Sequence, residues 1–165
     1  MGCCGTIGIM NNPLTHFNEE GRARMVDVSD KDHTSRKAVA TGEVHMRPET
    51  LQLIKEGQIK KGDVLAVAQV AGIMGAKRTH DVIPMCHPLL LTGVDISFQI
   101  NQEPDAETGL CSITVNATVK VTGQTGVEME ALVGVSAGLL CAWDMVKPLE
   151  KDESGQYPNA RMTDI

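Results

Sequence analysis

The sequence has few aromatic residues. They make up 2% of a chain that is otherwise ordinary for a globular protein, with 42% hydrophobic and 22% charged residues. Proteins that bind single-stranded nucleic acid stack successive bases on several aromatic rings, which this chain does not offer. Its net charge of −6 also disfavours contact with a phosphate backbone. We therefore expect an aliphatic core that contains many methionines, and no nucleic-acid partner.

Long apolar runs and zinc-type cysteine pairs are also missing. The sequence contains no run of 18 consecutive apolar residues, so we expect no membrane-spanning segment. Its cysteines, five in number, form no CxxC pair, and an odd count fits free thiols in a reducing cytoplasm. A chain of 165 residues is long enough to bury a core without disulfides or metal. We expect a cytoplasmic protein with no cofactor and no metal site.

The first residues fit poorly into such a domain. MGCCGT matches the N-myristoylation pattern, but the pattern is short and frequent by chance. Met10, followed by NNPLTHF, is an equally good start. We expect residues 1–13 to form a disordered or non-native extension, and residues 14–165 to form one domain.

Hydrophobic spacing predicts both strands and helices in the first half of the domain. Short strands are expected over residues 25–28 and 38–46, where apolar and polar residues alternate. Pro48 and Gly57 are typical of the two ends of a short helix. A long apolar helix should follow over residues 63–74, with Asp63 near its start.

In the second half, residues 93–100 and 111–121 alternate again and predict a β-hairpin. Thr125 and Glu128 form a capping-box pattern before a long apolar helix, which Pro148 should end. A last strand is expected over residues 161–165. This order predicts an α+β fold of the ferredoxin-like, split βαβ type, with an antiparallel sheet packed by two long helices.

A histidine and two cations mark the end of the first long helix. Lys77 and Arg78 lie in its last turn, where they could simply complement the helix dipole. Cys86 and His87 follow between two prolines that stiffen the segment. His87 alone could be a structural histidine, but beside surfaced cations it also fits an anion site.

The second long helix carries charged residues at both ends. Glu128 and Glu130 lie at its start, where a cap or the helix dipole could explain them. Asp144 lies near its end, where the dipole disfavours a carboxylate and where we expect limited solvent access, so it is a candidate acid or base. Lys147 could pair with Asp144 one turn away. Lys61 lies before a helix start, where a cation gains nothing from the dipole.

The two ends of this helix are too distant for one small ligand. Glu128 and Asp144 are 16 residues apart, which corresponds to about 24 Å along a helix. The many glycines and alanines of this helix imply close packing against a sheet or a partner helix. We therefore expect an oligomer in which neighbouring subunits share sites.

Three segments together carry a specific resemblance: MVDVSDK, KGDVLAVAQVAGIMGAKRTHDVIPMCHPL and TGVEMEALVGVSAGLLCAWDMVK. They resemble the cyclic pyranopterin monophosphate synthase family of molybdenum cofactor biosynthesis, from about Leu14 to Ile165. The resemblance implies a ferredoxin-like subunit in a homohexamer, a trimer of dimers. It also implies a lyase that converts (8S)-3′,8-cyclo-7,8-dihydroguanosine 5′-triphosphate to cyclic pyranopterin monophosphate and releases pyrophosphate.

The resemblance assigns roles residue by residue. Asp144, Lys61 and Lys147 match the family's catalytic residues. The residues that match its substrate-binding segments or the basic lining of its site are Met85, Cys86, His87, Glu128, Met129, Glu130, Lys77, Arg78 and Arg36. The resemblance leaves open a contact with the radical enzyme that makes the substrate.

Two departures from the family pattern stand out. Met85 replaces the usual leucine, a change that conserves volume. Family members continue with a basic, glycine-rich GGKSG-type segment, whereas this sequence stops at Ile165. The alternative to an enzyme is an oligomeric module that binds a guanine nucleotide without converting it, and pyrophosphate release distinguishes the two.

Overall fold

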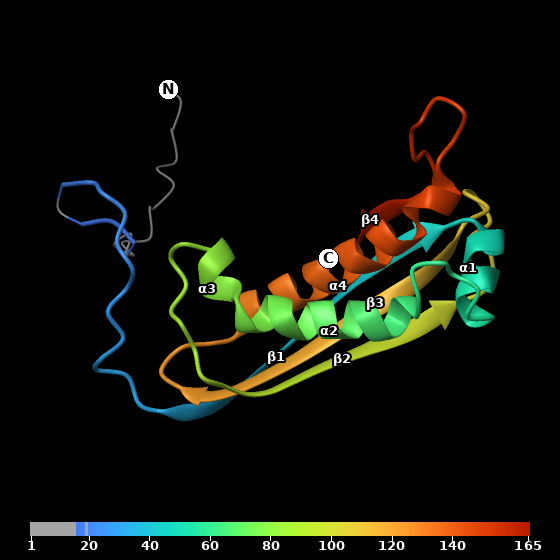
Figure 1. Ribbon diagram of the computed structural model, residues 1–165. Coiled ribbons are helices and arrows are strands. Elements are labelled where there is room, and N and C mark those ends of the chain that lie inside the picture. Colours follow the sequence, from blue (N-terminus) through green and yellow to red (C-terminus); the bar gives the residue numbers. More distant parts are fainter. Residues whose placement is uncertain (1–15, 19) are drawn as a thin grey trace, which may run out of the picture.

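The structure, a computed structural model, describes residues 16–18 and 20–165. The predictions for residues 1–13 lie outside the described residues. Eight elements follow one another within these described residues (Figure 1): β1 (Thr34–Met46), α1 (Pro48–Lys55), α2 (Val64–Lys77), α3 (Thr79–Val82), β2 (Leu91–Asn101), β3 (Cys111–Gly123), α4 (Glu128–Glu150) and β4 (Arg161–Thr163).

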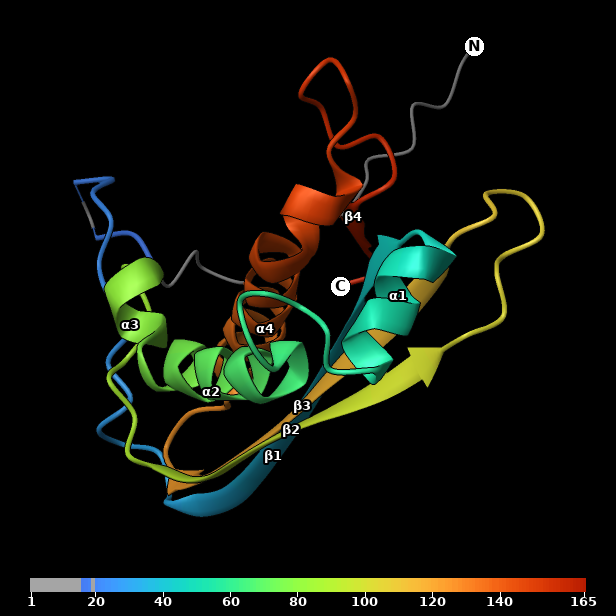
Figure 2. The ribbon, with the colours of Figure 1, turned by 45° about the vertical axis from the view of Figure 1, so that its right-hand side comes forward.

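The sheet has the strand order β2-β3-β1-β4, and every neighbouring pair is antiparallel. α2 and α4 lie side by side on one face of this sheet, as the two views in Figures 1 and 2 show. Each of the two long helices connects strands that are not neighbours in the sheet. This is the α+β, split βαβ arrangement that the sequence predicts.

The core lies between the sheet and these two helices. Along β1 and β3 alternate residues are fully buried against the helices, for example Val44, Met46, Ile113 and Val115. Their neighbours on the other face are largely polar, such as Lys120. This period of two is the pattern that located the strands in the sequence.

α2 and α4 approach each other closely because glycines line their contact. A Cβ atom added to Gly75 would lie 2.6 Å from the Cβ of Ala137, and one added to Gly72 would lie 3.1 Å from the carbonyl oxygen of Gly134. One added to Gly138 would lie 3.3 Å from a methyl group of Val115 in β3. The small residues of α4 therefore serve the packing within one chain, against both α2 and the sheet.

α4 differs from its predicted form at both ends. The helix begins at Glu128 after Val127, and Thr125 does not cap it. Gly126 leaves room for the Glu128 carboxylate to fold back over the turn, because a Cβ at Gly126 would collide with that carboxylate. Pro148 does not end the helix either, which continues to Glu150, although the proline removes the backbone bond to the carbonyl of residue 144.

α4 also passes the test of length and composition for a membrane span, although half of its most apolar stretch is buried within the chain. That burial is what the central helix of a packed α+β domain requires. Length and apolarity alone therefore do not distinguish α4 from a core helix.

Residues 25–28 do not form the predicted strand. The carbonyl oxygen of Val26 instead accepts a hydrogen bond from Nε2 of His87 at 2.8 Å. Asp27 turns the chain by accepting hydrogen bonds from the backbone and the hydroxyl of Ser29. The segment is thus fixed to the loop before β2, and it makes no ladder with a neighbouring strand.

The start of α1 is held by the end of α4. The buried carboxylate of Glu150 accepts hydrogen bonds from the backbone N–H of Arg47, at 3.1 Å, and from the hydroxyl of Thr50. A helix start leaves backbone donors unpaired, and here a distant acid supplies the acceptor. This contact fixes α1, and with it the loop that carries Lys61.

Candidate active site

Three predicted site residues meet near the end of α4. Lys61, in the loop before α2, donates from Nζ to Oδ2 of Asp144 at 2.8 Å. Lys147 lies one turn after Asp144, and its Nζ is 2.7 Å from the other carboxylate oxygen. Asp144 therefore holds two ammonium groups at once, one from its own helix and one from a residue 83 positions earlier in the sequence.

A second bond from Lys61 depends on the proline in α4. Its Nζ also donates to the main-chain carbonyl of Asp144, at 2.7 Å. In a regular helix that carbonyl would accept the N–H of residue 148, but Pro148 has none. The helix thus offers Lys61 a free carbonyl beside the carboxylate.

The two lysines set the ionisation of Asp144. Their hydrogen bonds, that of Lys147 first and that of Lys61 second, lower the pKa of Asp144 from 3.8 to about 2. Asp144 in turn raises the pKa of Lys147, chiefly by its hydrogen bond. At neutral pH the group is therefore one carboxylate between two ammonium ions. Contrary to the expectation of limited solvent access, the Asp144 side chain is 52% exposed.

Sequence reasoning missed the surroundings of this carboxylate. An open pocket of about 510 Å³ beside Asp144 and Lys147 is lined also by Ala137, Leu140, Cys141 and Trp143. Burial raises the pKa of the Cys141 thiol, and the charge of Asp144 adds to this effect. The helical spacing of Ala137, Leu140 and Cys141 from Asp144 could have indicated these neighbours.

A second pocket, of about 470 Å³, lies at the other end of α4. It brings together six of the predicted substrate-binding residues, namely Met85, Cys86, His87, Glu128, Met129 and Glu130. The first three come from the loop after α3, and the others come from the first turn of α4. The pocket also contains His16, Val26, Val28 and Lys31, none of which was singled out in the sequence.

Lys31 supplies a positive charge to this pocket. It lies in the charged loop before β1, where sequence alone gave no reason to prefer it to its neighbours. Gln124 fastens that loop by donating to the carbonyl oxygens of Ser29 and Lys31, at 3.1 and 2.9 Å. The position of Lys31 in the pocket therefore depends on a long-range bond to the turn before α4, which no local sequence pattern reveals.

Burial governs the titratable groups of this pocket. Glu130 is only 4% exposed, and this burial, reinforced by the charge of Glu128, raises the pKa of its carboxyl group. Burial also raises the pKa of Cys86, and the nearby Glu130 adds to this effect. His87 donates one ring N–H to Val26, which fixes the ring in the pocket wall. The pocket thus combines an acid of raised pKa with a fixed imidazole.

The three predicted basic residues are not among the residues that line this pocket. Lys77 lines a neighbouring pocket next to Ile73 and the start of β2. Arg78 joins α2 to α3. Arg36 donates to the carbonyl oxygens of Gly123 and Gln124, at 3.3 and 3.5 Å, and so fixes the turn before α4.

One group of side chains, within residues 16–18 and 20–165, has the composition of a metal site. The ligand atoms of Glu43, His45 and Asp164 lie within 4.8 Å of one another. Glu43 and His45 lie on the face of β1 opposite the buried Val44 and Met46. None of the predicted site residues belongs to this group.

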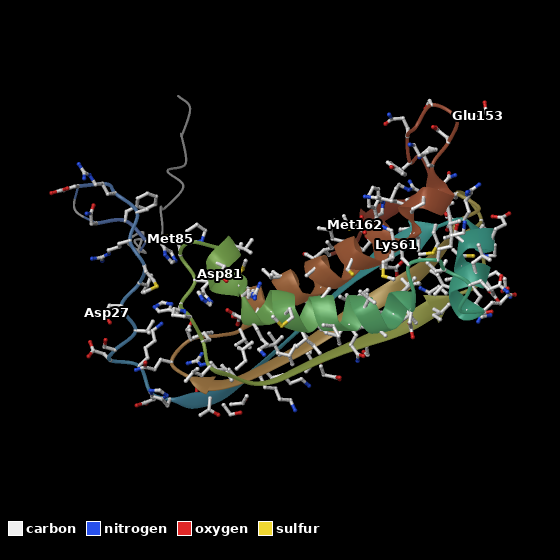
Figure 3. The ribbon with its side chains drawn as sticks, in the orientation of Figure 1. Asp27, Lys61, Asp81, Met85, Glu153 and Met162 are labelled. Atoms are coloured by element: carbon white, nitrogen blue, oxygen red, sulfur yellow. The ribbon has the colours of Figure 1, made fainter. Side chains whose placement is uncertain are left out.

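Apart from the three basic residues Lys77, Arg78 and Arg36, the predicted residues form two clusters, one near each end of α4. Figure 3 shows Met85, from the pocket, and Lys61, from the lysine–aspartate group, toward opposite ends of the helix layer. A helix rise of about 1.5 Å per residue puts about 24 Å between Glu128 and Asp144, too far for one small ligand. One cluster holds two cations around a carboxylate, and the other holds a buried acid, an imidazole and Lys31.

Comparison with known proteins gives a consistent result. The sequence model of the MoaC family matches residues 25–164. The chain is 60% identical over 139 residues to a cyclic pyranopterin monophosphate synthase of Thermoanaerobacter sp. (strain X514), which covers 84% of each chain. It is 57% identical over 143 residues to the protein of that name from Brevibacillus brevis, covering 87% of this chain and 85% of the relative. A probable cyclic pyranopterin monophosphate synthase of Pyrococcus abyssi is 50% identical over 152 residues, 92% of this chain and 90% of the relative.

Proposed function

This chain belongs to the MoaC family, and on that premise we propose that it is an enzyme of molybdenum cofactor biosynthesis, a cyclic pyranopterin monophosphate synthase. Its substrate would be (8S)-3′,8-cyclo-7,8-dihydroguanosine 5′-triphosphate, and its products cyclic pyranopterin monophosphate and pyrophosphate. The single observation that carries this proposal is the meeting of Lys61, Asp144 and Lys147, which come from two distant segments and match the family's catalytic residues.

The lysine–aspartate group has the chemistry that the reaction needs. Two ammonium groups, 2.8 and 2.7 Å from one carboxylate, can neutralise phosphate oxygens and the charge that develops on departing pyrophosphate. Ring opening and reclosure also require proton transfers, for which a lysine is a donor and a carboxylate an acceptor. A pKa of about 2 makes Asp144 a weak base, so its main part is to anchor both lysines, which are the proposed proton donors.

The pocket at the other end of α4 is the proposed site for the remainder of the substrate. Cys86, His87 and Glu130 supply hydrogen-bonding groups on a wall that also contains Met85 and Met129. Arg36 fixes the turn before α4, which lines this pocket, and Lys77 and Arg78 supply cations at the end of α2. Glu128 folds over that turn and closes the pocket edge.

One substrate cannot span both clusters of a single chain, so we propose that sites form between subunits of a homohexamer, a trimer of dimers. The helix layer leaves apolar side chains uncovered, among them Val67, Val70 and Leu140, which are 44%, 60% and 55% exposed. Uncovered apolar surface of this kind is typical of subunit contacts. The small residues of α4 are already used within the chain, so the contact would use these larger side chains instead.

The free cysteines indicate the cellular compartment. Cys86, Cys111 and Cys141 are free thiols, as in proteins of a reducing compartment, and we place the enzyme in the cytoplasm. The reaction is a rearrangement with loss of pyrophosphate, and the proposed residues supply its acid–base chemistry without a cofactor.

The test is pyrophosphate release from the cyclised substrate by the purified chain. We expect pyrophosphate and the cyclic monophosphate product to form in equal amounts, and no pyrophosphate to form from GTP itself. Binding of the cyclised substrate with no release of pyrophosphate would contradict the proposal, and would identify the chain as a guanine-nucleotide-binding module.

A further inference from the structure

Trp143 lies next to Asp144 in the chain and connects the candidate site to the segment that follows α4. Its indole N–H donates to the carbonyl oxygen of Ala160 at 3.1 Å. Its ring also meets Tyr157 edge to face, with ring centroids 5.1 Å apart and an interplanar angle of 65°. Segment 151–160 is therefore held against α4 at two points by one side chain.

The segment is built to return Tyr157 to the helix. The carboxylate of Asp152 accepts hydrogen bonds from the Ser154 hydroxyl and the Gln156 backbone, at 2.7 and 2.8 Å, and closes a tight loop. Gly155 adopts a φ of +85° at the turn, a conformation that favours glycine. Pro158 then restricts Tyr157 to an extended backbone. These contacts bring Tyr157 back to α4 and against Trp143.

The same indole ring lies against Lys147. The Nζ of Lys147 is 5.7 Å from the centroid of the Trp143 ring while it bonds Asp144 at 2.7 Å. A lysine side chain has several rotatable bonds, and one ion pair on a half-exposed surface restricts them weakly. An aromatic face on a second side of the ammonium group restricts it further, because the ring attracts the cation.

From these contacts we propose that Trp143 and Tyr157 are positioning residues that hold the ammonium group of Lys147 at the candidate catalytic site. Trp143 supplies the face, and Tyr157 fixes the tilt of that face through its edge contact. The catalytic role of Lys147 rests on the proposed function, but its placement against the ring does not. Trp143 acts through Lys147 and needs no contact with substrate.

The proposal has a consequence that does not depend on turnover. The aromatic face favours the charged form of Lys147, so losing the face should lower the pKa of this lysine. A lower pKa leaves more neutral amine at a given pH, and neutral amine is the form that reacts with acylating reagents. The reactivity of Lys147 therefore reports the contact directly.

The experiment compares the Trp143→Leu, Trp143→Phe and Tyr157→Leu variants of the full chain with wild type. Each lysine is labelled with trace acetic anhydride across a pH series and quantified by mass spectrometry, with the exposed Lys120 as internal reference. We expect Trp143→Leu to shift the Lys147 labelling curve to lower pH by roughly half a unit, or about threefold in rate below its pKa. Trp143→Phe keeps an aromatic face but loses the bond to Ala160, so it should recover most of this shift. Gln156→Ala is the matched control within the loop, and should leave the curve unchanged.

Turnover is measured on the same preparations. Trp143→Leu and Tyr157→Leu should lower kcat about fivefold with KM within about twofold, and the basic limb of the pH profile should move with the labelling curve. Trp143→Leu and Trp143→Phe both lose the hydrogen bond to Ala160. Comparing the thermal midpoints of these two variants therefore separates the effect of that lost bond on stability from the effect of the lost aromatic face.

Unchanged Lys147 labelling in folded Trp143→Leu would overturn the proposal, whatever the activity. If Trp143→Leu does not fold, the Tyr157→Leu variant is used instead, because Tyr157 lies in the loop after α4. Unchanged Lys147 labelling in folded Tyr157→Leu would then overturn the proposal. An inactive wild type with the expected labelling shift would instead refute the proposed function and leave the positioning contact established.

Discussion

Lys61 donates to both the carboxylate and the main-chain carbonyl of Asp144, and the second bond is open to it because Pro148 lacks an N–H. A helix carbonyl without its usual donor is an acceptor near the helix C-terminus, where the dipole favours a cation. The proline that was expected to end α4 thus leaves an acceptor for a lysine from another element. The geometry of the site is set by the backbone as well as by the carboxylate.

Replacing Asp144 with asparagine should separate catalysis from stability. The amide side chain would keep the shape of the carboxylate but lose the charge that holds two lysines together. We expect turnover to fall on the order of 10²-fold or more, with substrate binding largely kept. Single-turnover rate and thermal midpoint measured on one preparation check this. Turnover within a few fold of wild type would mean that Asp144 is a structural partner of the lysines only.

The low pKa of Asp144 also predicts a pH dependence of stability. The pKa in the folded chain, about 2, lies below the ordinary 3.8. Its stabilising contribution is therefore complete above about pH 4 and is lost as the pH falls toward 2. The difference in thermal midpoint between wild type and Asp144→Asn should be constant from pH 5 to 7 and shrink below pH 4. A difference that grows on acidification would contradict the assigned ion pairs.

Shared sites can be tested by mixing two inactive variants, one from each cluster. Lys147→Ala removes a cation from the lysine–aspartate group, and His87→Ala alters the pocket at the other end of α4. If each site takes one cluster from each of two subunits, random exchange at equal amounts should restore roughly a quarter of wild-type activity. Activity and subunit exchange are measured on the same mixture.

The matched control mixes Lys61→Ala with Lys147→Ala. Both lysines bond the same Asp144 in one chain, so this mixture should stay inactive. If the first mixture also stays inactive after complete exchange, both clusters belong to sites within one chain, and the shared-site proposal fails.

Most of the fold could be predicted from the sequence because local signals and tertiary packing agree. Pro48 does begin α1, and Asp63 does cap α2 by accepting from the backbone of Leu65 and Ala66 at 3.0 Å. The hairpin follows from its period of two. Residues 25–28 carried the same alternation, but a bond to His87 took the place of a strand partner. Local pattern cannot show that competition.

The site was less predictable because its defining contacts are long-range. Asp144 and Lys147 are one helical turn apart, so their pairing could be expected from spacing. The partnership of Asp144 with Lys61 spans 83 residues, and only the family resemblance brought the two together beforehand. Lys31 lies in a loop that Gln124 fastens, and Trp143 lies in α4 but contacts the loop over residues 151–160. The paths of both loops depend on side-chain bonds to distant backbone, which periodicity does not encode.

The contact between α2 and α4 predicts opposite effects for two glycines. A Cβ at Gly75 would lie 2.6 Å from the Cβ of Ala137 and 3.2 Å from the carbonyl of Val133, so alanine should push the helices apart. A Cβ at Gly134 would meet its nearest atoms at 3.4 Å. We expect Gly75→Ala to destabilise by about 1–3 kcal/mol. Gly134→Ala should be near neutral, or more stable by up to about 1 kcal/mol from helix propensity.

Urea unfolding of the two variants checks this pair. Equal destabilisation of both would show that the helices do not approach as closely at Gly75 as the structure describes. Turnover should fall with Gly75→Ala as well, because α2 follows the loop that carries Lys61.

Glu130 provides a prediction in which stability and function change in opposite directions. Its burial, and next the charge of Glu128, raise its carboxyl pKa above the ordinary 4.5. For an acid of raised pKa, folding favours the protonated form. The stabilising contribution is therefore present below pH 4.5 and is lost as the pH rises through the folded pKa. At pH 8, well above the ordinary pKa, this contribution should be reduced or lost.

Glu130→Gln should then raise the thermal midpoint at pH 8, have little effect at pH 4, and reduce turnover by removing a group from the substrate pocket. Glu128→Gln is a companion variant, because Glu128 is exposed on the same pocket and its removal takes away one cause of the raised Glu130 pKa. If Glu130 served packing alone, its replacement by glutamine would leave turnover unchanged. A gain in stability together with a loss of activity therefore indicates a functional role. A lower midpoint at pH 8 in Glu130→Gln would instead mean that the charged form is stabilised in place, and the assigned direction of its pKa would be wrong.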